Sequence, residues 1–252
     1  MSILKVNEIR SQTGSQISIP SGYELSVQGT VLSSSSLPPN PAGNAGKFLK
    51  STGSALTWEN VGPTGIQVFT SSGTWTRPAG VTKILVKLVG GGGAGSGVGE
   101  TGAAGGYSER LLDVSSITSV NVTVGQGSTS PTYYSGSAGS GNSTSFGTYL
   151  SATAGRGANS SHQHCGGLPG VGSGGDLNLY GGGGSGHMYW SGPPAGNSYF
   201  GGAGATGHPQ GGNFAHNHSS HAAYGCGGPA GYHTSNLGAN GKGGVVVVYE
   251  FK

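Results

Sequence analysis

Charged side chains are scarce in this sequence of 252 residues, at 8% of the total. The net charge is +3 with histidine neutral, and the lysines and arginines form no cluster. This charge is too weak and too dispersed to hold a phosphate backbone, so the composition argues against nucleic-acid binding.

Long apolar runs and cysteines are also few. The longest apolar run, Val245–Tyr249, is far too short to span a membrane. Lys5, Glu8 and Arg10 interrupt the start of the chain before an apolar stretch forms, so we expect no signal peptide. Two cysteines are too few for a disulfide framework.

Glycine is abundant, with 55 copies, whereas hydrophobic residues reach only 33%. A globular domain usually has roughly 45–50% apolar residues, so we expect no conventional core along the whole chain. Disorder is not expected either, because the chain has 11 Tyr, 6 Phe and 3 Trp. Collagen is excluded because no strict Gly-X-Y period is present.

Glycine and charge divide the chain into two parts. Ten glycines precede Gly90 and 45 follow from there. Between Val114 and Gly244, by contrast, only three residues are charged, namely Arg156, Asp176 and Lys242. An ordinary polar part is therefore followed by a nearly uncharged, glycine-rich part.

The polar part predicts three stretches. Short alternating runs between Ile3 and Val27 predict small strands, which place a first segment at residues 1–32. Serines and prolines at 33–41 indicate a linker, and residues 47–50 and 55–58 predict a small hairpin, together forming a second segment at 33–65.

The remaining residues, 66–252, predict an all-β, sandwich-like domain. Apolar alternation and turn residues indicate strands at 67–69, 74–76, 82–89, 107–114, 120–124, 146–152 and 245–251. The last of these is a continuous β-branched run, which indicates burial on both faces.

Residues 154–244 show little periodicity but many Gly-Gly pairs. A flexible loop of this length is improbable inside a compact domain. Glycine backbones can approach closely, so extended strands of the polyproline II type could stack and bond through backbone groups. We therefore expect ordered polyglycine II layers here.

Several stretches resemble structural proteins of tailed bacteriophages. Residues 3–22 (ILKVNEIRSQTGSQISIPSG) resemble the opening of such proteins, notably in marine phages, and residues 46–59 (GKFLKSTGSALTWE) resemble a motif of fibre shafts. Residues 66–252 resemble the glycine-rich C-terminal domain of tail fibres and tip adhesins. The motifs that carry this resemblance are TWTRPAGV at 74–81, VKLVGGGG at 86–93, GGYSE at 105–109, VTVG at 122–125 and GGVVVVY at 243–249.

The resemblance implies a virion protein made in the host cytoplasm and assembled as a homotrimeric fibre. Its N-terminal segment would attach to another virion protein, and its C-terminal domain would bind a host surface glycan or outer-membrane protein, without membrane insertion. The chain is short for a whole tail fibre, so a capsid decoration or head fibre without a receptor role is the main alternative.

Aromatic residues in low-charge loops are the candidates for receptor binding, since Tyr and Trp give a large contact area with a polar handle. The alternative is that these rings face inward and fill gaps between glycine strands. The candidates are Tyr133, Tyr134, Tyr180, Tyr189, Trp190, Tyr199, Phe200, Phe214, Tyr224 and Tyr232.

Two His-x-His pairs, His162 with His164 and His216 with His218, raise the question of a metal. Positions i and i+2 of a strand share a face, so three chains could present six imidazoles to a transition-metal ion on a trimer axis. The alternative is that these side chains are hydrogen-bonding residues of surface loops. No other cofactor is expected.

Cys165 and Cys226 each precede a Gly-Gly pair. The matching contexts allow a disulfide between them or two equivalent buried thiols. The other reading is that both are small buried residues that form no disulfide.

Catalysis is not expected. A carbohydrate-degrading spike, the remaining alternative, needs paired carboxylates, but the glycine-rich half offers Asp176 with no glutamate nearby. The G-x-G-x-x-G match at 202–207 opens no predicted helix, and a chain this rich in glycine produces such matches by chance.

Overall fold

The structure is a computed structural model that describes residues 25–27, 30–32, 42–51, 55–132, 136–159, 165–186, 194–204, 222–231 and 237–252. The chain forms two compact units, Met1–Gly62 and Pro63–Lys252. The fold is all-β, as expected, and the described residues include no helix that could cross a membrane.

The first unit contains two small antiparallel pairs. Strand β1 (Leu25–Val27) pairs with β2 (Thr30–Leu32). The hairpin expected near residue 50 is formed by β3 (Lys47–Ser51) and β4 (Leu56–Asn60). The strands predicted between Ile3 and Gly22 lie outside the described residues.

The second unit contains two five-stranded antiparallel sheets. One sheet, called the β9 sheet, has the order β12 (Gly172–Ser173), β11 (Leu150–Ala152), β10 (Thr144–Phe146), β9 (Ser119–Thr123) and β6 (Gly73–Thr76). The other, called the β7 sheet, has the order β13 (Leu177–Leu179), β8 (Tyr107–Asp113), β7 (Lys83–Val89), β14 (Val245–Phe251) and β5 (Gly65–Phe69).

The two sheets enclose one hydrophobic core. Alternate residues of each strand point inward, so that Trp75 of the β9 sheet and Ile84 and Val248 of the β7 sheet are fully buried. The buried Glu250 carboxylate at the edge of this core accepts hydrogen bonds from Trp75 Nε1 at 2.9 Å and Gln67 Nε2 at 2.7 Å. The alternating strand pattern of the sequence therefore yields a sandwich.

Two strand predictions need correction. Residues 146–152 form two strands, not one, because the chain turns at Gly147, whose φ of +52° suits glycine. Strand β14 is not buried on both faces: Val246 and Val248 are buried, whereas Val247 and Tyr249 on the opposite face are partly exposed. Within one chain, only one face of the β7 sheet packs on the core.

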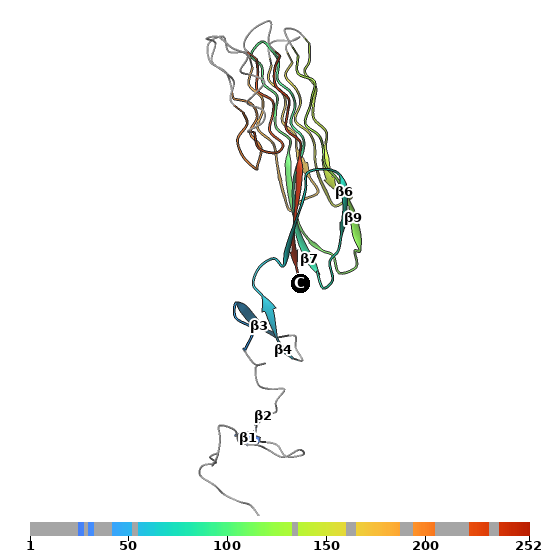
Figure 1. Ribbon diagram of the computed structural model, residues 1–252, viewed down its shortest axis with the longest axis vertical. Coiled ribbons are helices and arrows are strands. Elements are labelled where there is room, and N and C mark those ends of the chain that lie inside the picture. The colour runs from blue at the N-terminus through green and yellow to red at the C-terminus, as the bar shows by residue number, and fades with distance from the viewer. Residues whose placement is uncertain are drawn as a thin grey trace, which may run out of the picture. The chain divides into compact units, whose positions relative to one another are not determined.

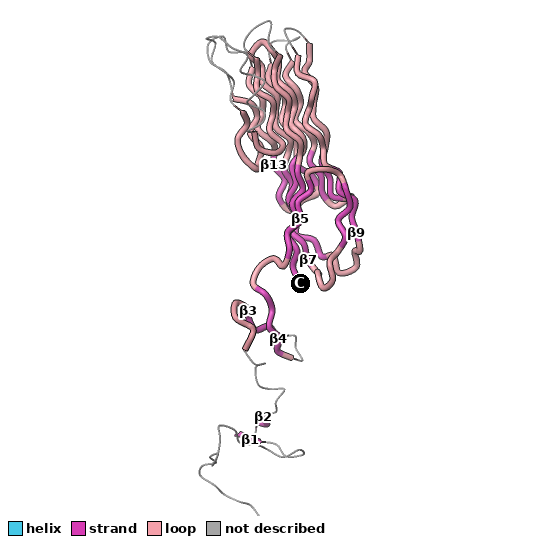
Figure 2. Tube along the Cα trace, in the orientation of Figure 1, coloured by secondary structure: helices cyan, strands magenta, loops and turns pink. Residues whose placement is uncertain are grey.

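Beyond the sandwich, the chain runs in extended segments that carry no strand assignment and lie side by side (Figures 1 and 2). Most of them either continue a strand of the sandwich or lead back into one. The chain therefore alternates between outgoing segments, which run away from the sandwich, and returning segments, which run back to it. We number them along the chain as segments 1 (90–96), 2 (100–106), 3 (125–132), 4 (137–143), 5 (153–159), 6 (165–171), 7 (180–186), 8 (194–198), 9 (225–231) and 10 (237–244).

Backbone hydrogen bonds join these segments with a period of three residues. In segment 1, the N–H groups of Gly90 and Gly93 donate to segment 2, those of Gly91 and Ala94 to segment 4, and that of Gly92 to segment 10. Its carbonyls accept from segments 3, 5 and 9. Three residues per turn is the repeat of a polyproline II helix, so the layers expected at 154–244 are present among the described residues there. They also include segments 1 to 4, between residues 90 and 143, which were not expected from the sequence.

The segments form a lattice with two central members. Segment 1 is bonded to segments 2, 3, 4, 5, 9 and 10, and segment 2 to segments 1, 5, 6, 7, 8 and 9. The other eight segments are bonded each to the next, from 3 through to 10, and segment 10 is bonded back to segment 3. They therefore make a closed ring around the two central segments.

The lattice requires glycine where backbones meet. A Cβ on Gly92 would lie 1.9 Å from the carbonyl oxygen of Cys226, and one on Gly105 would lie 2.1 Å from that of Gly90. Alanine occurs where there is room for a methyl group, as at the fully buried Ala94, which packs with Ala138 and Ala158. The interruptions of the glycine runs are therefore part of the packing.

Candidate functional site

The end of the lattice away from the sandwich is the first candidate surface. Segments 1, 3, 5, 7 and 9 end there, and segments 2, 4, 6, 8 and 10 begin there. The connections between them in the sequence are residues 97–99, 133–136, 160–164, 187–193 and 232–236. The connection at 97–99 is described in full, and the others lie wholly or mostly outside the described residues.

The described connection joins the two central segments through a buried hydrogen-bonded turn. The Ser96 N–H donates to the Glu100 carbonyl at 2.9 Å, and the Glu100 N–H donates to Ser96 Oγ at 3.2 Å. Ser96 Oγ also donates to the Glu100 carboxylate, and both residues are fully buried. The centre of this end is therefore closed by fixed polar contacts.

Several predicted site residues lie outside the described residues. They are the receptor candidates Tyr133, Tyr134, Tyr189, Trp190, Phe214 and Tyr232, and the metal candidates His162, His164, His216 and His218. In the sequence, all of these except Phe214, His216 and His218 fall between segments 3 and 4, 5 and 6, 7 and 8, or 9 and 10. Among the residues that are described, no three His, Cys, Asp or Glu side chains form a group that could hold a metal.

Two candidate tyrosines are exposed away from that end. Tyr180, at the start of segment 7, is 72% exposed and pairs through its backbone with Val171. Tyr224, just before segment 9, is 47% exposed. Both are accessible, but each lies where its segment meets the sandwich.

Tyr199 and Phe200 pack on a buried tyrosine of the sheet. The Tyr199 ring stacks on Tyr107 with ring centroids 3.6 Å apart, and the Phe200 ring meets Tyr107 edge-on at 6.1 Å. Tyr107 is 1% exposed. This pair therefore follows the alternative reading, in which rings fill gaps, although Tyr199 keeps an exposed side.

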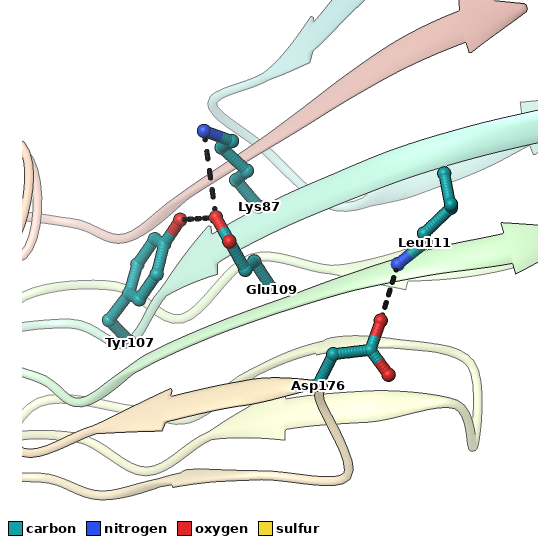
Figure 3. Close-up of polar contacts among 5 residues, drawn as sticks. All are labelled: Lys87, Tyr107, Glu109, Leu111 and Asp176. Atoms are coloured by element: carbon teal, nitrogen blue, oxygen red, sulfur yellow. Dashed lines mark hydrogen bonds and ion pairs between the residues drawn. The ribbon is translucent and has the colours of Figure 1, made fainter.

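Tyr107 belongs to a polar group on the outer face of the β7 sheet, shown in Figure 3. Its hydroxyl donates to Glu109 Oε2 at 2.5 Å, and Lys87 Nζ lies 3.5 Å from the same oxygen. Burial, followed by the bond to the Glu109 carboxylate, raises the pKa of Tyr107 far above its ordinary value. The phenol is therefore a hydrogen-bond donor at any physiological pH.

Asp176, the one acidic residue of the glycine-rich half, has a structural contact. Its carboxylate accepts the Leu111 N–H at 2.9 Å, and its own N–H donates to the Glu109 carbonyl at 2.8 Å (Figure 3). These bonds close the free edge of β8 next to β13. The sequence alone did not reveal this role, because it depends on the turn at 174–176.

The two cysteines occupy different environments and are not joined to each other. Cys165 is exposed, whereas Cys226 is fully buried with its thiol 3.3 Å from the Gly201 carbonyl oxygen. Neither a disulfide nor two equivalent buried thiols is present, and the other reading, small buried residues without a disulfide, holds for Cys226 but not for Cys165. The shared Gly-Gly context does not reveal this difference, because segment 6 is bonded to one central segment and segment 9 to both.

Sequence reasoning also missed Lys87, Tyr107 and Glu109 as a group. A signal for the contact between Lys87 and Glu109 was present, because residues 82–89 and 107–114 were both predicted strands. Their pairing places Lys87 opposite Glu109. The stacking of Tyr199 on Tyr107, by contrast, joins residues that share no sequence pattern.

The comparison with protein families agrees with this architecture. A family model described as a glycine-rich domain matches residues 67–250, which span all ten lattice segments and nearly all of both sheets. No curated protein matches the sequence. Because the match covers most of the chain, this protein belongs to the glycine-rich domain family.

Proposed function

We propose that this chain is a virion protein of a tailed bacteriophage, a tail fibre that binds the host cell during adsorption. The observation that carries the proposal is the lattice, which directs five connections to one end of the domain. Three copies would act together, and residues 1–32 would attach them to another virion protein.

A backbone-bonded lattice suits a recognition role. The bonds between segments use main-chain groups, so the connecting residues can change without loss of the frame. Interior positions such as Gly92 exclude side chains, so ligand contacts must come from the connections and the outer surface. A fixed frame also lowers the entropy cost of binding.

The ligand that we propose is a surface glycan or an outer-membrane protein loop. The far-end connections contain Tyr133, Tyr134, Tyr189, Trp190 and Tyr232 but no Asp, Glu, Lys or Arg. Aromatic rings contact sugar rings and apolar loop residues over a large area at little entropic cost. A single weak site suffices, because three linked copies gain affinity through avidity.

Competition for adsorption tests this proposal. The purified full chain, added to host cells before the phage, is expected to reduce phage adsorption. The variant Tyr189→Ser/Trp190→Ser is expected to compete less, whereas the control Tyr180→Ser, which alters an exposed tyrosine near the sandwich, should compete as the wild type does.

Electron microscopy of virions labelled with an antibody against residues 63–252 completes the test. We expect label at the end of the tail. Label on the head, together with no competition by the purified chain, would favour a capsid decoration. Release of sugar from host polysaccharide by the chain would contradict binding without turnover.

A further inference from the structure

The two outer faces of the sandwich differ in chemistry. The outward positions of the β9 sheet hold small polar side chains, among them Thr74, Thr76, Ser119, Asn121, Thr123 and Ser151. The outward positions of the β7 sheet expose large apolar side chains by 37% to 58% of their surface, at Ile66, Val68, Leu111, Leu177 and Leu179. Only the first face has the composition of a surface that stays in water.

A continuous row of apolar side chains crosses this face. Tyr249 of β14 lies opposite Ile66 on one side and Leu85 on the other, and Leu85 lies opposite Leu111. Side chains directly opposite each other on neighbouring strands are in contact distance. The row therefore crosses β5, β14, β7 and β8 without a break.

The size of this face matches a protein interface. Its five exposed aliphatic residues present roughly 400 Å² of apolar surface, at the level where a patch on a monomer is often functional. A standard interface buries about 800 Å² on each partner, of which roughly 57% is non-polar. The face thus supplies nearly all of the apolar area that one such interface needs, and in a trimer this area is shared between the two neighbouring copies.

The sequence of strand β14 also indicates that this face is covered by another layer. Val245–Tyr249 is a continuous apolar run, a pattern typical of strands that are covered on both faces. Within one chain Val246 and Val248 are buried on one side, whereas on the other side Val245 is buried but Val247 and Tyr249 stay partly exposed. The sequence of β14 is therefore that of a strand with a second layer, which a single chain does not provide.

The charges on this face are balanced within one chain, so they do not oppose contact between copies. Strand β7 contributes Lys83 and Lys87, and the neighbouring β8 contributes Asp113 and Glu109 at the paired positions. Asp176 closes the free edge of β8, so contact through the face is favoured over addition of a strand there.

We propose that the outer face of the β7 sheet is the surface through which copies of this chain associate. The inference deepens the homotrimer of the proposed function and rests on it. The occupant of the face is a second copy, packed with Ile66 and Val68 of one chain against Leu111 and Leu177 of the next.

The molar mass of the full chain, measured by light scattering over a dilution series, tests the proposal. We expect the wild type to have three times the subunit mass of 24.7 kDa. The variant Val68→Lys/Leu111→Lys should fall to the mass of one subunit. The control Thr74→Lys/Asn121→Lys adds the same charge to a cross-strand pair on the polar face and should keep the wild-type mass.

A single-subunit mass for the wild type at every concentration, or a wild-type mass for the Val68→Lys/Leu111→Lys variant, would overturn the proposal. In these outcomes the face would have another occupant, such as another virion protein. A mass of two subunits would keep the interface and refute the trimer. If the variant fails to fold, side-chain footprinting of the wild type decides, since Leu111 and Tyr249 should become more reactive on dilution.

These outcomes are independent of the test of the proposed function. Antibody labelling of virions locates the protein whatever its oligomeric state. A monomeric chain found at the tail end would refute the interface alone, and a trimeric chain found on the head would refute the recognition role alone.

Discussion

Substitution of one central glycine by alanine tests the lattice directly. In Gly92→Ala, the new Cβ would lie 1.9 Å from the Cys226 carbonyl oxygen, whereas real Cβ atoms stay beyond 3.0 Å. Segments 1 and 9 must therefore move apart by about 1 Å, a shift that a closely packed interior resists.

The cost follows from the hydrogen bonds that this shift breaks. Gly92 N–H donates to the Lys242 carbonyl at 2.8 Å, and Lys242 N–H donates to the Cys226 carbonyl at 2.9 Å. Each buried group left without a partner costs about 1–3 kcal/mol. Lower entropy of the unfolded chain offsets about 0.4–1 kcal/mol. We expect a net loss of about 3 kcal/mol in the free energy of unfolding, or a fall of about 6–12 °C in Tm for a domain of this size.

Thermal unfolding followed by circular dichroism or calorimetry gives the measurement. The matched control is Gly183→Ala in segment 7, where no atom lies within 4 Å of the new Cβ. We expect this control to be neutral or more stable by up to about 1 kcal/mol. Equal Tm values for the two variants would refute the claim that close backbone contact dictates glycine in this lattice.

Three further predictions concern the sandwich and the thiols. Trp75→Phe removes a buried hydrogen bond to the Glu250 carboxylate and should lower the free energy of unfolding in urea by about 1.5–3 kcal/mol; no change would contradict the role of this bond. Burial raises the pKa of Tyr107, so the unfolded chain loses this proton first as the pH rises past the ordinary value of about 10. The free energy of unfolding should therefore fall above pH 10, less steeply in Tyr107→Phe, and equal slopes would refute this assignment. A thiol reagent should modify Cys165 in the native chain and Cys226 only after unfolding, and rapid reaction of both would contradict the burial of Cys226.

The sandwich was largely predictable because its strands follow a period of two. Runs such as Thr82–Val89 alternate apolar and polar residues, and the observed β7 covers nearly the same residues. The error at 146–152 arose where Gly147 turns a strand pattern back on itself. Local pattern was therefore reliable where side chains decide the structure.

The lattice could be anticipated only as a type of structure. Which segments bond to each other depends on the position of each backbone group and not on side chains. Neighbouring glycines such as Gly91 and Gly92 look the same in sequence, although their N–H groups bond to different segments. The same limit applies to the candidate site. Nothing in the sequence links Tyr199 to Tyr107, because their contact depends on where segment 8 ends.

The pairing of distant segments has a consequence for damage by proteases. Segment 1 is bonded to segment 10, although they stand at opposite ends of the glycine-rich region, and every ring segment is held by neighbours on both sides. A cut in one of the far-end connections therefore severs the chain but releases no piece, since both new ends stay anchored in the bundle. A domain built in this way can be nicked and still keep its shape.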